Sequence, residues 1–288
     1  MNKEVRRSCV AFAAAVAMSA AALAEPTAVV RDIAYNAAAD KDGLGDLYLP
    51  AHVKPDTPVV LAIHGGGWSG GDRASWSGVA QFFCKDLGFA AFNIEYRLVK
   101  KGPWPLCGND CVAAANYLLG EDFKKRFGIN CNKIWVCGGS AGGHLALWTG
   151  LSLPPDRVAG IVSISGIGDL VPDAQVNPGR YVGFFGHKPS PAELTAASPL
   201  SLVTAKAPPI FCSHATVDGA VPFESSRVFV EACRRAGVQT EFFVYEKRDS
   251  GHSIWIPGSQ PHTLFPDIEA AVVKFVKKAE TKTEEKGK

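Results

Sequence analysis

The sequence lacks a dominant charge, internal repeats, a zinc-type cysteine spacing and, beyond its first residues, any long apolar run. Its 288 residues carry 30 basic and 28 acidic side chains, with the two signs interspersed. A nearly neutral chain has no electrostatic reason to bind nucleic acid or an anionic membrane. With 47% hydrophobic and 20% charged residues, the composition excludes a disordered or fibrous protein and predicts one large soluble domain.

The one long apolar stretch lies at the N-terminus and has the features of a secretory signal peptide. A basic head precedes an alanine-rich run from Cys9 to Leu23, and small residues at Ala22 and Ala24 predict cleavage before Glu25. The run is too short to favour a membrane span, although an uncleaved anchor stays open as the alternative, as does the export route. We expect an exported protein, periplasmic or extracellular, with no membrane attachment after cleavage.

Removal of residues 1–24 leaves no formal net charge, because the leader holds three of the 30 basic and one of the 28 acidic residues. It also reduces eight cysteines to an odd number, so at least one thiol has no internal partner. Cys107 and Cys111 could pair only if the start of the following helix is distorted. Cys137 and Cys212 lie in apolar runs and are expected to be small core residues. No metal is expected.

In the rest of the chain, short β-branched runs alternate with longer amphipathic segments. Strands are expected at 28–35, 46–49, 59–64, 89–96, 133–137, 158–165, 210–214 and 240–245. Helices are expected at 75–87, 109–119, 141–151, 222–236 and 266–278. This alternation predicts an α/β fold, a mainly parallel sheet with an antiparallel edge and helices on both faces. The chemistry of such sheets lies beyond the carboxyl ends of the strands.

One segment, 166–208, interrupts the alternation. It is long, rich in proline and lies between two expected strands, so we expect a cap-like insertion over the sheet edge that shapes the binding site. Its only aromatic residues, Tyr181, Phe184 and Phe185, are expected to flank the cleft. The expected organisation is a single domain over 25–280 that includes this insertion, followed by a flexible tail over 281–288.

A G-x-S-x-G motif at 138–142 stands directly between an expected strand and an expected helix. That context predicts a nucleophile elbow, a sharp turn that raises the hydroxyl of Ser140 above the sheet. A second match at 67–71 also follows a strand, but no apolar helix begins directly after it. We therefore expect Ser140 to be the nucleophile and Ser69 to lie in a loop.

The second match overlaps a glycine run, HGGG at 64–67, that follows an expected strand. Glycines there allow the backbone N–H groups of Gly66 and Gly67 to turn towards a developing oxyanion, and the N–H of Ala141 supplies another donor. His64 precedes the turn, so we expect it to anchor the loop and not to act as a base.

A serine hydroxyl is a poor nucleophile at its free pKa and needs a base and an orienting carboxylate. In folds with a nucleophile elbow these follow the serine in the order acid, then histidine. Asp218 and His252 follow the last two expected strands and are the expected acid and base, with His252 favoured over the other histidines by its position. Asp169, after the preceding strand, is the alternative acid.

Six short motifs resemble those of α/β-hydrolase esterases grouped with hormone-sensitive lipase and, more closely, of exported bacterial feruloyl and acetylxylan esterase-like proteins. They are HGGGW at 64–68, EYRL at 95–98, GGSAGGHLA at 138–146, SP at 198–199, HATVDGAVP at 214–222 and GH at 251–252. The resemblance covers nearly the whole mature chain. It implies an α/β-hydrolase fold, ester hydrolysis by Ser140, Asp218 and His252, and a structural pair between Arg97 and Asp110.

The expected mechanism is attack of the serine on an ester carbonyl, followed by release of the acyl-enzyme by water. It requires no cofactor. The expected substrates are acetyl or feruloyl esters of carbohydrate, as small molecules or polysaccharides, with Trp68 and Trp255 in contact with the substrate because they directly follow catalytic elements. Two alternatives stay open: an amide hydrolase, arylformamidase or peptidase-like, on the same triad, and a non-catalytic binding module on the same fold.

Overall fold

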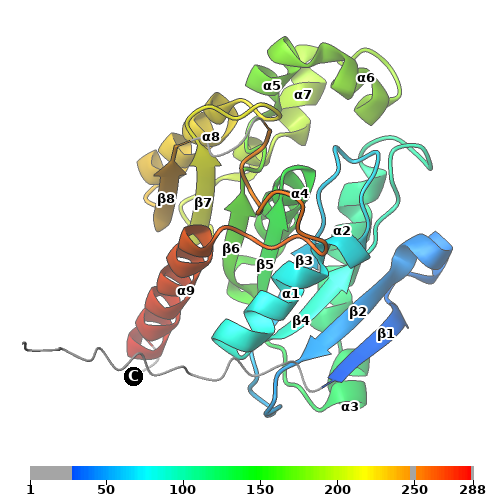
Figure 1. Cartoon of the computed structure of the whole chain (residues 1–288), viewed down its shortest axis with the longest axis vertical. Coiled ribbons are helices and arrows are strands. Elements are labelled where there is room, and N and C mark those ends of the chain that lie inside the picture. The colour runs from blue at the N-terminus through cyan, green and yellow to red at the C-terminus, as the bar shows by residue number, and fades with distance from the viewer. Residues whose placement is uncertain (1–27, 247–250, 287–288) are drawn as a thin grey trace, which may run out of the picture.

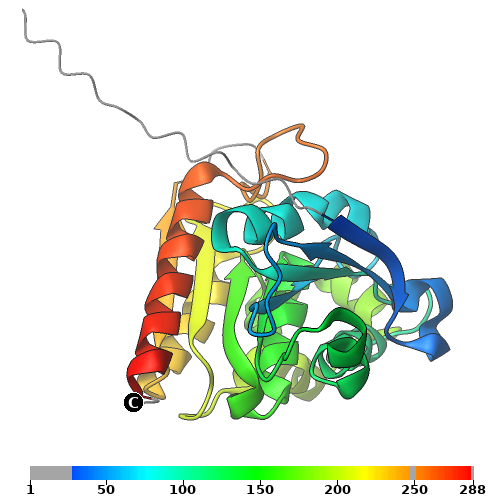
Figure 2. The ribbon, with the colours of Figure 1, turned by 90° about the horizontal axis from the view of Figure 1, so that it is seen from below.

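In the described residues, eight strands form one sheet and helices cover both of its faces (Figures 1 and 2). The computed structural model describes residues 28–246 and 251–286, and the expected signal peptide at 1–24 lies outside them. The strands are ordered β1-β2-β4-β3-β5-β6-β7-β8. Their bounds are β1 (Ala28–Ala34), β2 (Leu44–Leu49), β3 (Val59–Ile63), β4 (Ala90–Ile94), β5 (Ile134–Gly139), β6 (Val158–Ile164), β7 (Ile210–Ala215) and β8 (Thr240–Tyr245).

Strand directions confirm the expected mainly parallel sheet with an antiparallel edge. β2 runs antiparallel to both β1 and β4, and the pairings from β4 through β3 to β8 are parallel. Side chains alternate between the faces, because Leu61 and Ile63 of β3 join one core cluster whereas Val60 and Ala62 join the other. Both faces are buried, so the central strands are continuous apolar runs in the sequence.

The helices lie in two layers, one on each face of the sheet. On one face, in front in Figure 1, are α1 (Arg73–Leu87) and α9 (Pro266–Lys286). On the other face are α2 (Leu106–Leu118), α3 (Glu121–Phe127), α4 (Ala141–Ser152) and α8 (Phe223–Arg235). Local sequence fixes the ends of α1, since Asp72 accepts a 2.7 Å hydrogen bond from the Ser75 N–H and Gly88 ends the helix with a left-handed φ of 69°.

Helix α9 is longer than the sequence pattern predicts. It reaches Lys286, whereas the sequence pattern places its end near residue 278. The flexible tail over 281–288 stays a prediction, and 287–288 lie outside the described residues. The amphipathic pattern ends near residue 278, but a helix can continue into solvent without an apolar face. No helix within the described ranges has both the length and the apolar character needed to cross a membrane.

The seven cysteines of the described chain are buried free thiols. Cys107 and Cys111 lie one turn apart on α2, where helical geometry is kept and no disulfide forms. Burial raises the pKa of Cys107 to about 12, so its reactive thiolate is suppressed. Cys137 and Cys212 lie inside strands of the core, as expected.

The insertion at 166–208 is helical, which the sequence pattern did not predict. It contains α5 (Leu170–Val176), α6 (Pro178–Phe185) and α7 (Pro191–Ala197). Pro178 and Pro191 each occupy the first turn of a helix, where a missing N–H costs nothing. Ser190 and Glu193 form a capping box at the start of α7. Two of the prolines of the insertion therefore begin helices.

The aromatic residues of the insertion attach it to the body of the protein. Tyr181, Phe184 and Phe185 are only 0%, 1% and 7% exposed. Phe184 stacks on Trp104 at a centroid distance of 5.1 Å. The prediction that these rings flank the cleft is wrong, because the hydrophobic effect favours packing them against the core when a core surface is within reach.

His144 adds a polar link between α4 and the insertion. Its side chain is fully buried, and Nε2 lies 3.0 Å from the backbone oxygen of Ala197 at the end of α7. The oxygen is an acceptor, so Nε2 carries a proton and donates. Burial lowers the pKa of His144 to about 4, with a smaller opposing effect from the Ala197 hydrogen bond.

The ion pair implied by the resemblance is present between the loop after β4 and α2. Arg97 donates from Nε to Asp110 Oδ2 at 2.8 Å and from Nη2 to Oδ1 at 2.5 Å. Asn36 Nδ2 adds a 2.9 Å hydrogen bond to the same carboxylate, which is completely buried. The loop after β1, the loop after β4 and helix α2 are therefore joined through one buried charge.

We predict that Arg97→Ala lowers the free energy of unfolding by about 3–5 kcal/mol, because Asp110 is left buried without its cation. Urea unfolding measures this loss. The matched control is Arg235→Ala, since the Arg235 side chain is 70% exposed and its nearest carboxylate oxygen is 3.9 Å away. That change is expected to cost less than about 1 kcal/mol, and equal losses in the two variants would contradict the assignment.

We also predict a pH-dependent stability from His144. In the unfolded chain this histidine takes up a proton below about pH 6.5, whereas in the folded chain it does so only near pH 4. The unfolded state thus binds more protons between these values, and the free energy of unfolding falls by up to about 1.4 kcal/mol per unit as the pH drops. His144→Gln removes this component, so parallel stability curves for parent and variant from pH 7 to 4 would refute the prediction.

Candidate active site

Ser140 lies at the tip of a strained turn between β5 and α4. Its φ of 57° and ψ of −126° are unusual for a residue with a side chain. The turn is crowded, because a Cβ atom on Gly138 would lie 2.1 Å from the Gly142 oxygen and one on Gly142 would lie 2.2 Å from the Ile63 oxygen. Glycine is therefore required on both sides of the serine, as in a nucleophile elbow.

Ser69 lies in a different setting. It is exposed in a turn in which the Gly66 oxygen accepts hydrogen bonds from the N–H groups of Ser69 and Gly70, at 3.2 and 3.0 Å. Helix α1 begins only at Arg73. The second G-x-S-x-G match thus forms a loop and not a strand-to-helix elbow, as the sequence predicts.

The glycine loop 64–71 runs directly against the elbow. A Cβ atom on Gly65 would lie 2.9 Å from the Gly139 oxygen and 3.2 Å from the Ser140 Cβ. Gly66 and Gly67 have left-handed φ values of 117° and 58°. Within the described chain, the backbone N–H groups of Gly66, Gly67 and Ala141 donate no hydrogen bond. These are free donors close to a serine, which is what an oxyanion hole requires.

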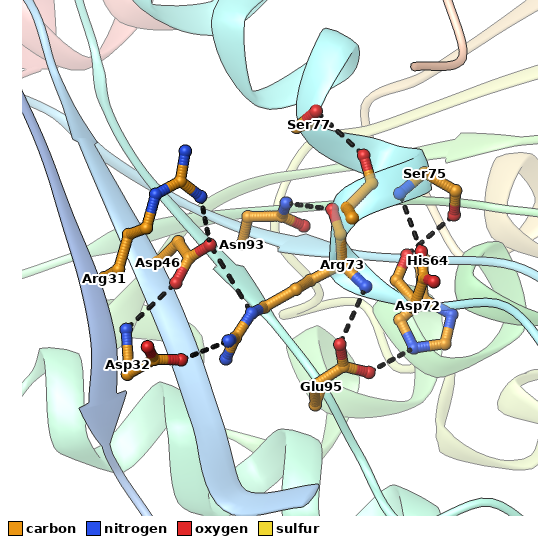
Figure 3. A network of polar contacts seen from close by, with 11 residues as sticks. Arg31, Asp32, Asp46, His64, Asp72, Arg73, Ser75, Ser77, Asn93 and Glu95 are labelled. Carbon is orange, nitrogen blue, oxygen red and sulfur yellow. Dashed lines mark hydrogen bonds and ion pairs between the residues drawn. The ribbon is translucent and has the colours of Figure 1, made fainter. Parts of the chain in front are cut away.

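His64 holds the start of this loop in place. Its ring is fully buried, stacks on Tyr96 at 4.3 Å, and places Nε2 3.5 Å from Glu95 Oε2. Glu95 Oε1 also accepts a 3.1 Å hydrogen bond from the N–H of Arg73, at the start of α1 (Figure 3). The contacts are those of an anchoring side chain.

The same network continues to the antiparallel edge of the sheet (Figure 3). Arg73 pairs through its guanidinium with Asp32 and, at 3.4 Å, with Asp46. Asp46 is 3% exposed and accepts from Arg31 Nη1 at 3.1 Å and from the Asp32 N–H at 3.0 Å. Paired charges therefore fix the position at which α1 leaves the glycine loop.

Asp218 and His252 come together beyond β7 and β8. Asp218 Oδ2 lies 2.6 Å from His252 Nδ1. Its other oxygen, Oδ1, accepts hydrogen bonds from the N–H groups of Ala220 at 2.8 Å and Val221 at 3.0 Å. His214 Nε2 lies 3.4 Å from Oδ2. The acid side chain is completely buried and is held by four donors.

The negative charge of Asp218 favours one tautomer of His252. Burial raises the pKa of Asp218, but hydrogen bonds from His214 and His252 lower it further, so the pKa is well below its ordinary value. Asp218 is therefore a carboxylate, and the proton of the 2.6 Å contact belongs to His252 Nδ1. In the neutral ring Nε2 is then an acceptor, and no described residue hydrogen-bonds to it. That is the form able to receive a serine proton.

Aromatic contacts connect this histidine with the elbow. Residues 251–265 cross in front of the sheet to α1 before α9 begins (Figure 1). In it, Trp255 lies 6.2 Å from His252 and 6.5 Å from Trp76 between ring centroids. Trp76 in turn abuts Gly139, whose added Cβ would lie 2.5 Å from the indole. His252 and Ser140 thus lie at the same edge of the sheet.

The two tryptophans expected to contact substrate differ in exposure. Trp68 is 0% exposed and packs on Phe184 at 4.4 Å and on His144 at 5.3 Å. Its ring helps to attach the insertion, and contact between Trp68 and substrate stays a prediction. Trp255 is partly exposed beside His252, and its role stays a prediction.

Asp169, the alternative acid, belongs to the insertion. Its Oδ1 accepts hydrogen bonds from the Val171 N–H at 3.0 Å and from Ser198 Oγ at 3.3 Å, which makes it the cap of α5. His214 is the residue whose role sequence reasoning missed, although it is the first residue of the HATVDGAVP motif; its spacing of four from Asp218 was the available signal. No three His, Cys, Asp or Glu side chains in the described ranges are grouped to hold a metal ion.

Several known proteins of similar sequence are described as esterases. Esterase LipC of Mycobacterium tuberculosis is 30% identical over 196 residues, which cover 62% of this chain and 48% of LipC. Esterase LipQ of the same organism is 27% identical over 220 residues, or 69% of this chain and 52% of LipQ. The chain therefore spans about half the length of these curated relatives.

Solved structures show the same fold. A truncated carbohydrate esterase from gut microbiota superposes with a TM-score of 0.75 and 20% identity, over 91% of this chain and 99% of that one. Est2 of Thermogutta terrifontis with propionate bound gives a TM-score of 0.66 and 26% identity, over 89% and 94% of the two chains.

The BD-FAE family model matches residues 45–233. Because this match spans well over half of the chain, the protein belongs to the BD-FAE family of α/β-hydrolase esterases.

Proposed function

We propose that the protein is an exported serine hydrolase that cleaves carboxylic esters through Ser140, His252 and Asp218. One observation carries the proposal. The 2.6 Å pair of His252 and Asp218 lies at the sheet edge where Ser140 occupies a strained elbow. The basic head and alanine-rich run of the first 24 residues support export.

In the proposed mechanism the Ser140 hydroxyl attacks the ester carbonyl while His252 Nε2 takes its proton. Asp218 keeps the other ring nitrogen protonated and stabilises the imidazolium that forms. The free N–H groups of Gly66, Gly67 and Ala141 stabilise the negative oxygen of the tetrahedral intermediate. His252 then protonates the leaving alcohol, and water releases the acyl group by the reverse sequence of proton transfers.

The proposed substrates are acetyl or feruloyl esters of carbohydrates. Support comes from the BD-FAE family match and from the likeness to a carbohydrate esterase and to a propionate-bound esterase. Trp255 is the one partly exposed tryptophan in ring contact with His252. An exposed indole next to the base offers an apolar face to a sugar ring or to a feruloyl group.

We predict that Ser140→Ala lowers kcat by at least about 10³-fold on whichever ester the parent hydrolyses, because the members of a triad act as a unit. The assay compares p-nitrophenyl acetate, methyl ferulate, acetylated xylan and a long-chain p-nitrophenyl ester. Ser69→Ala is the matched control and should leave kcat within about twofold. Loss of turnover in Ser69→Ala alone would assign the nucleophile to Ser69. A preference of the parent for the long-chain p-nitrophenyl ester would contradict the assignment of carbohydrate esters as substrates.

We predict that Asp218→Asn lowers kcat by about 10³–10⁴-fold, because an amide no longer fixes the tautomer of His252. Asp169→Asn tests the alternative acid and should mainly loosen α5, whose first turn it caps. Steady-state kinetics together with thermal unfolding separates the two effects. The opposite ranking of the two kcat values would assign the acid to Asp169.

A further inference from the structure

The insertion reaches the loop that carries the catalytic acid through one arginine. Arg180, near the start of α6, donates from Nη2 to the backbone oxygen of Ala220 at 2.9 Å. Ala220 belongs to the acid loop, which we define as residues 216–222 between β7 and α8. This contact joins two segments 40 residues apart.

Arg180 is itself fixed by a buried carboxylate on α5. Its Nη1 donates to Asp173 Oδ2 at 2.8 Å. The Tyr181 hydroxyl donates to the same oxygen at 2.6 Å, and Asn177 Nδ2 donates to Oδ1 at 2.7 Å. Asp173 is 0% exposed. Because a buried ion pair gains little stability over apolar packing, its effect here is to hold the guanidinium in one orientation.

The carbonyl that Arg180 binds belongs to the peptide that orients the acid. The Ala220 C=O and the Val221 N–H share one planar peptide unit, and they point to opposite sides of it. Arg180 holds the oxygen side at 2.9 Å, while the N–H side donates to Asp218 Oδ1 at 3.0 Å. A charged donor on the carbonyl both fixes this plane and strengthens the N–H as a donor.

The orientation of Asp218 matters because two histidines share its other oxygen. Oδ2 lies 2.6 Å from His252 Nδ1 and 3.4 Å from His214 Nε2. His214 Nε2 also lies 3.1 Å from the Val221 oxygen. A shift of the Ala220–Val221 peptide would therefore change the position of Oδ2 relative to both histidines. A contact that fixes the orientation of the Ala220–Val221 peptide would keep Asp218 Oδ2 hydrogen-bonded to His252.

We propose that Arg180 is a positioning residue of the active site, which acts through the Ala220–Val221 peptide to keep Asp218 directed at His252. This inference rests on the proposed function, because it assigns Asp218 and His252 their catalytic roles. The insertion then contributes to turnover from the acid side, through the hydrogen bond from Arg180 to the Ala220 oxygen. Its buried aromatic rings serve to attach it.

The test compares Arg180→Met with Arg157→Met. Arg157 Nη2 also donates to a backbone carbonyl, at 3.2 Å from the Leu119 oxygen. Arg157 directly precedes β6, at the end of the sheet away from the candidate active site, so it is the matched control. We expect Arg180→Met to lower kcat about 10–100-fold with KM nearly unchanged, since a small misplacement of a catalytic group is enough for such a loss. Arg157→Met is expected to leave kcat within about twofold, whatever its unfolding temperature.

Arg180→Lys keeps the charge beside Asp173, so it covers the case in which the methionine variant fails to fold. A lysine lacks the planar fork that binds Asp173 and Ala220 together, and we expect a loss of kcat between those of the parent and Arg180→Met. Equal kcat values for Arg180→Lys, Arg157→Met and the parent would overturn the proposal.

A readout that needs no turnover separates this inference from the proposed function. The short Asp218–His252 hydrogen bond should give a downfield ring-proton resonance in the NMR spectrum, assigned by its loss in Asp218→Asn. We expect Arg180→Met to shift or broaden that resonance and Arg157→Met to leave it in place. An unchanged resonance in Arg180→Met refutes the positioning role of Arg180, and a shifted or broadened resonance supports it. Both conclusions hold even if the protein hydrolyses none of the tested esters.

Discussion

The site depends on the close approach of two backbone segments at the carboxyl ends of neighbouring parallel strands. The turn after β5 and the loop after β3 touch with no side chain between them, because Gly65 faces the Gly139 carbonyl and Gly142 faces the Ile63 carbonyl. Any Cβ atom at these glycines would push the segments apart. The contact places free backbone donors beside Ser140 without the use of any charged group.

A second constraint is the buried charge of Asp218. A carboxylate in this setting is stable only when its oxygens are satisfied, and here two backbone N–H groups and two histidines surround it. The polar network that holds the start of α1 follows the same rule, since Asp46 is buried and pairs with two arginines. The candidate active site is therefore bordered by paired charges, although the 30 basic and 28 acidic residues of the chain nearly balance.

The regular part of the fold was predictable because each of its signals is local. Buried parallel strands such as β3 are apolar along their whole length, and the elbow motif is confined to five residues with a strand before it and a helix after it. The insertion was not predictable in the same way. Pro178 begins a helix, although a proline is more often a sign of irregular chain, and the pattern cannot say whether Phe184 faces a cleft or the core.

The polar contacts of the site show the same limit. Asp218 and His252 follow strands at expected positions, so topology alone pairs them. Trp68 also follows a strand, yet its ring turns inward because the insertion offers apolar surface. The contacts of His214 and Arg180 depend on which segments meet in space, and no spacing in the sequence encodes the meeting of α6 with the acid loop.

The central claim is that Ser140 is the activated nucleophile, and covalent labelling tests it most directly. The protein would be incubated with a fluorophosphonate, which reacts with a serine only when a base and an oxyanion hole assist. The adduct would be located by peptide mass spectrometry. We predict one adduct, on Ser140, and none in a protein unfolded beforehand. An adduct on Ser69, or no adduct on a folded protein that hydrolyses esters, would contradict the account.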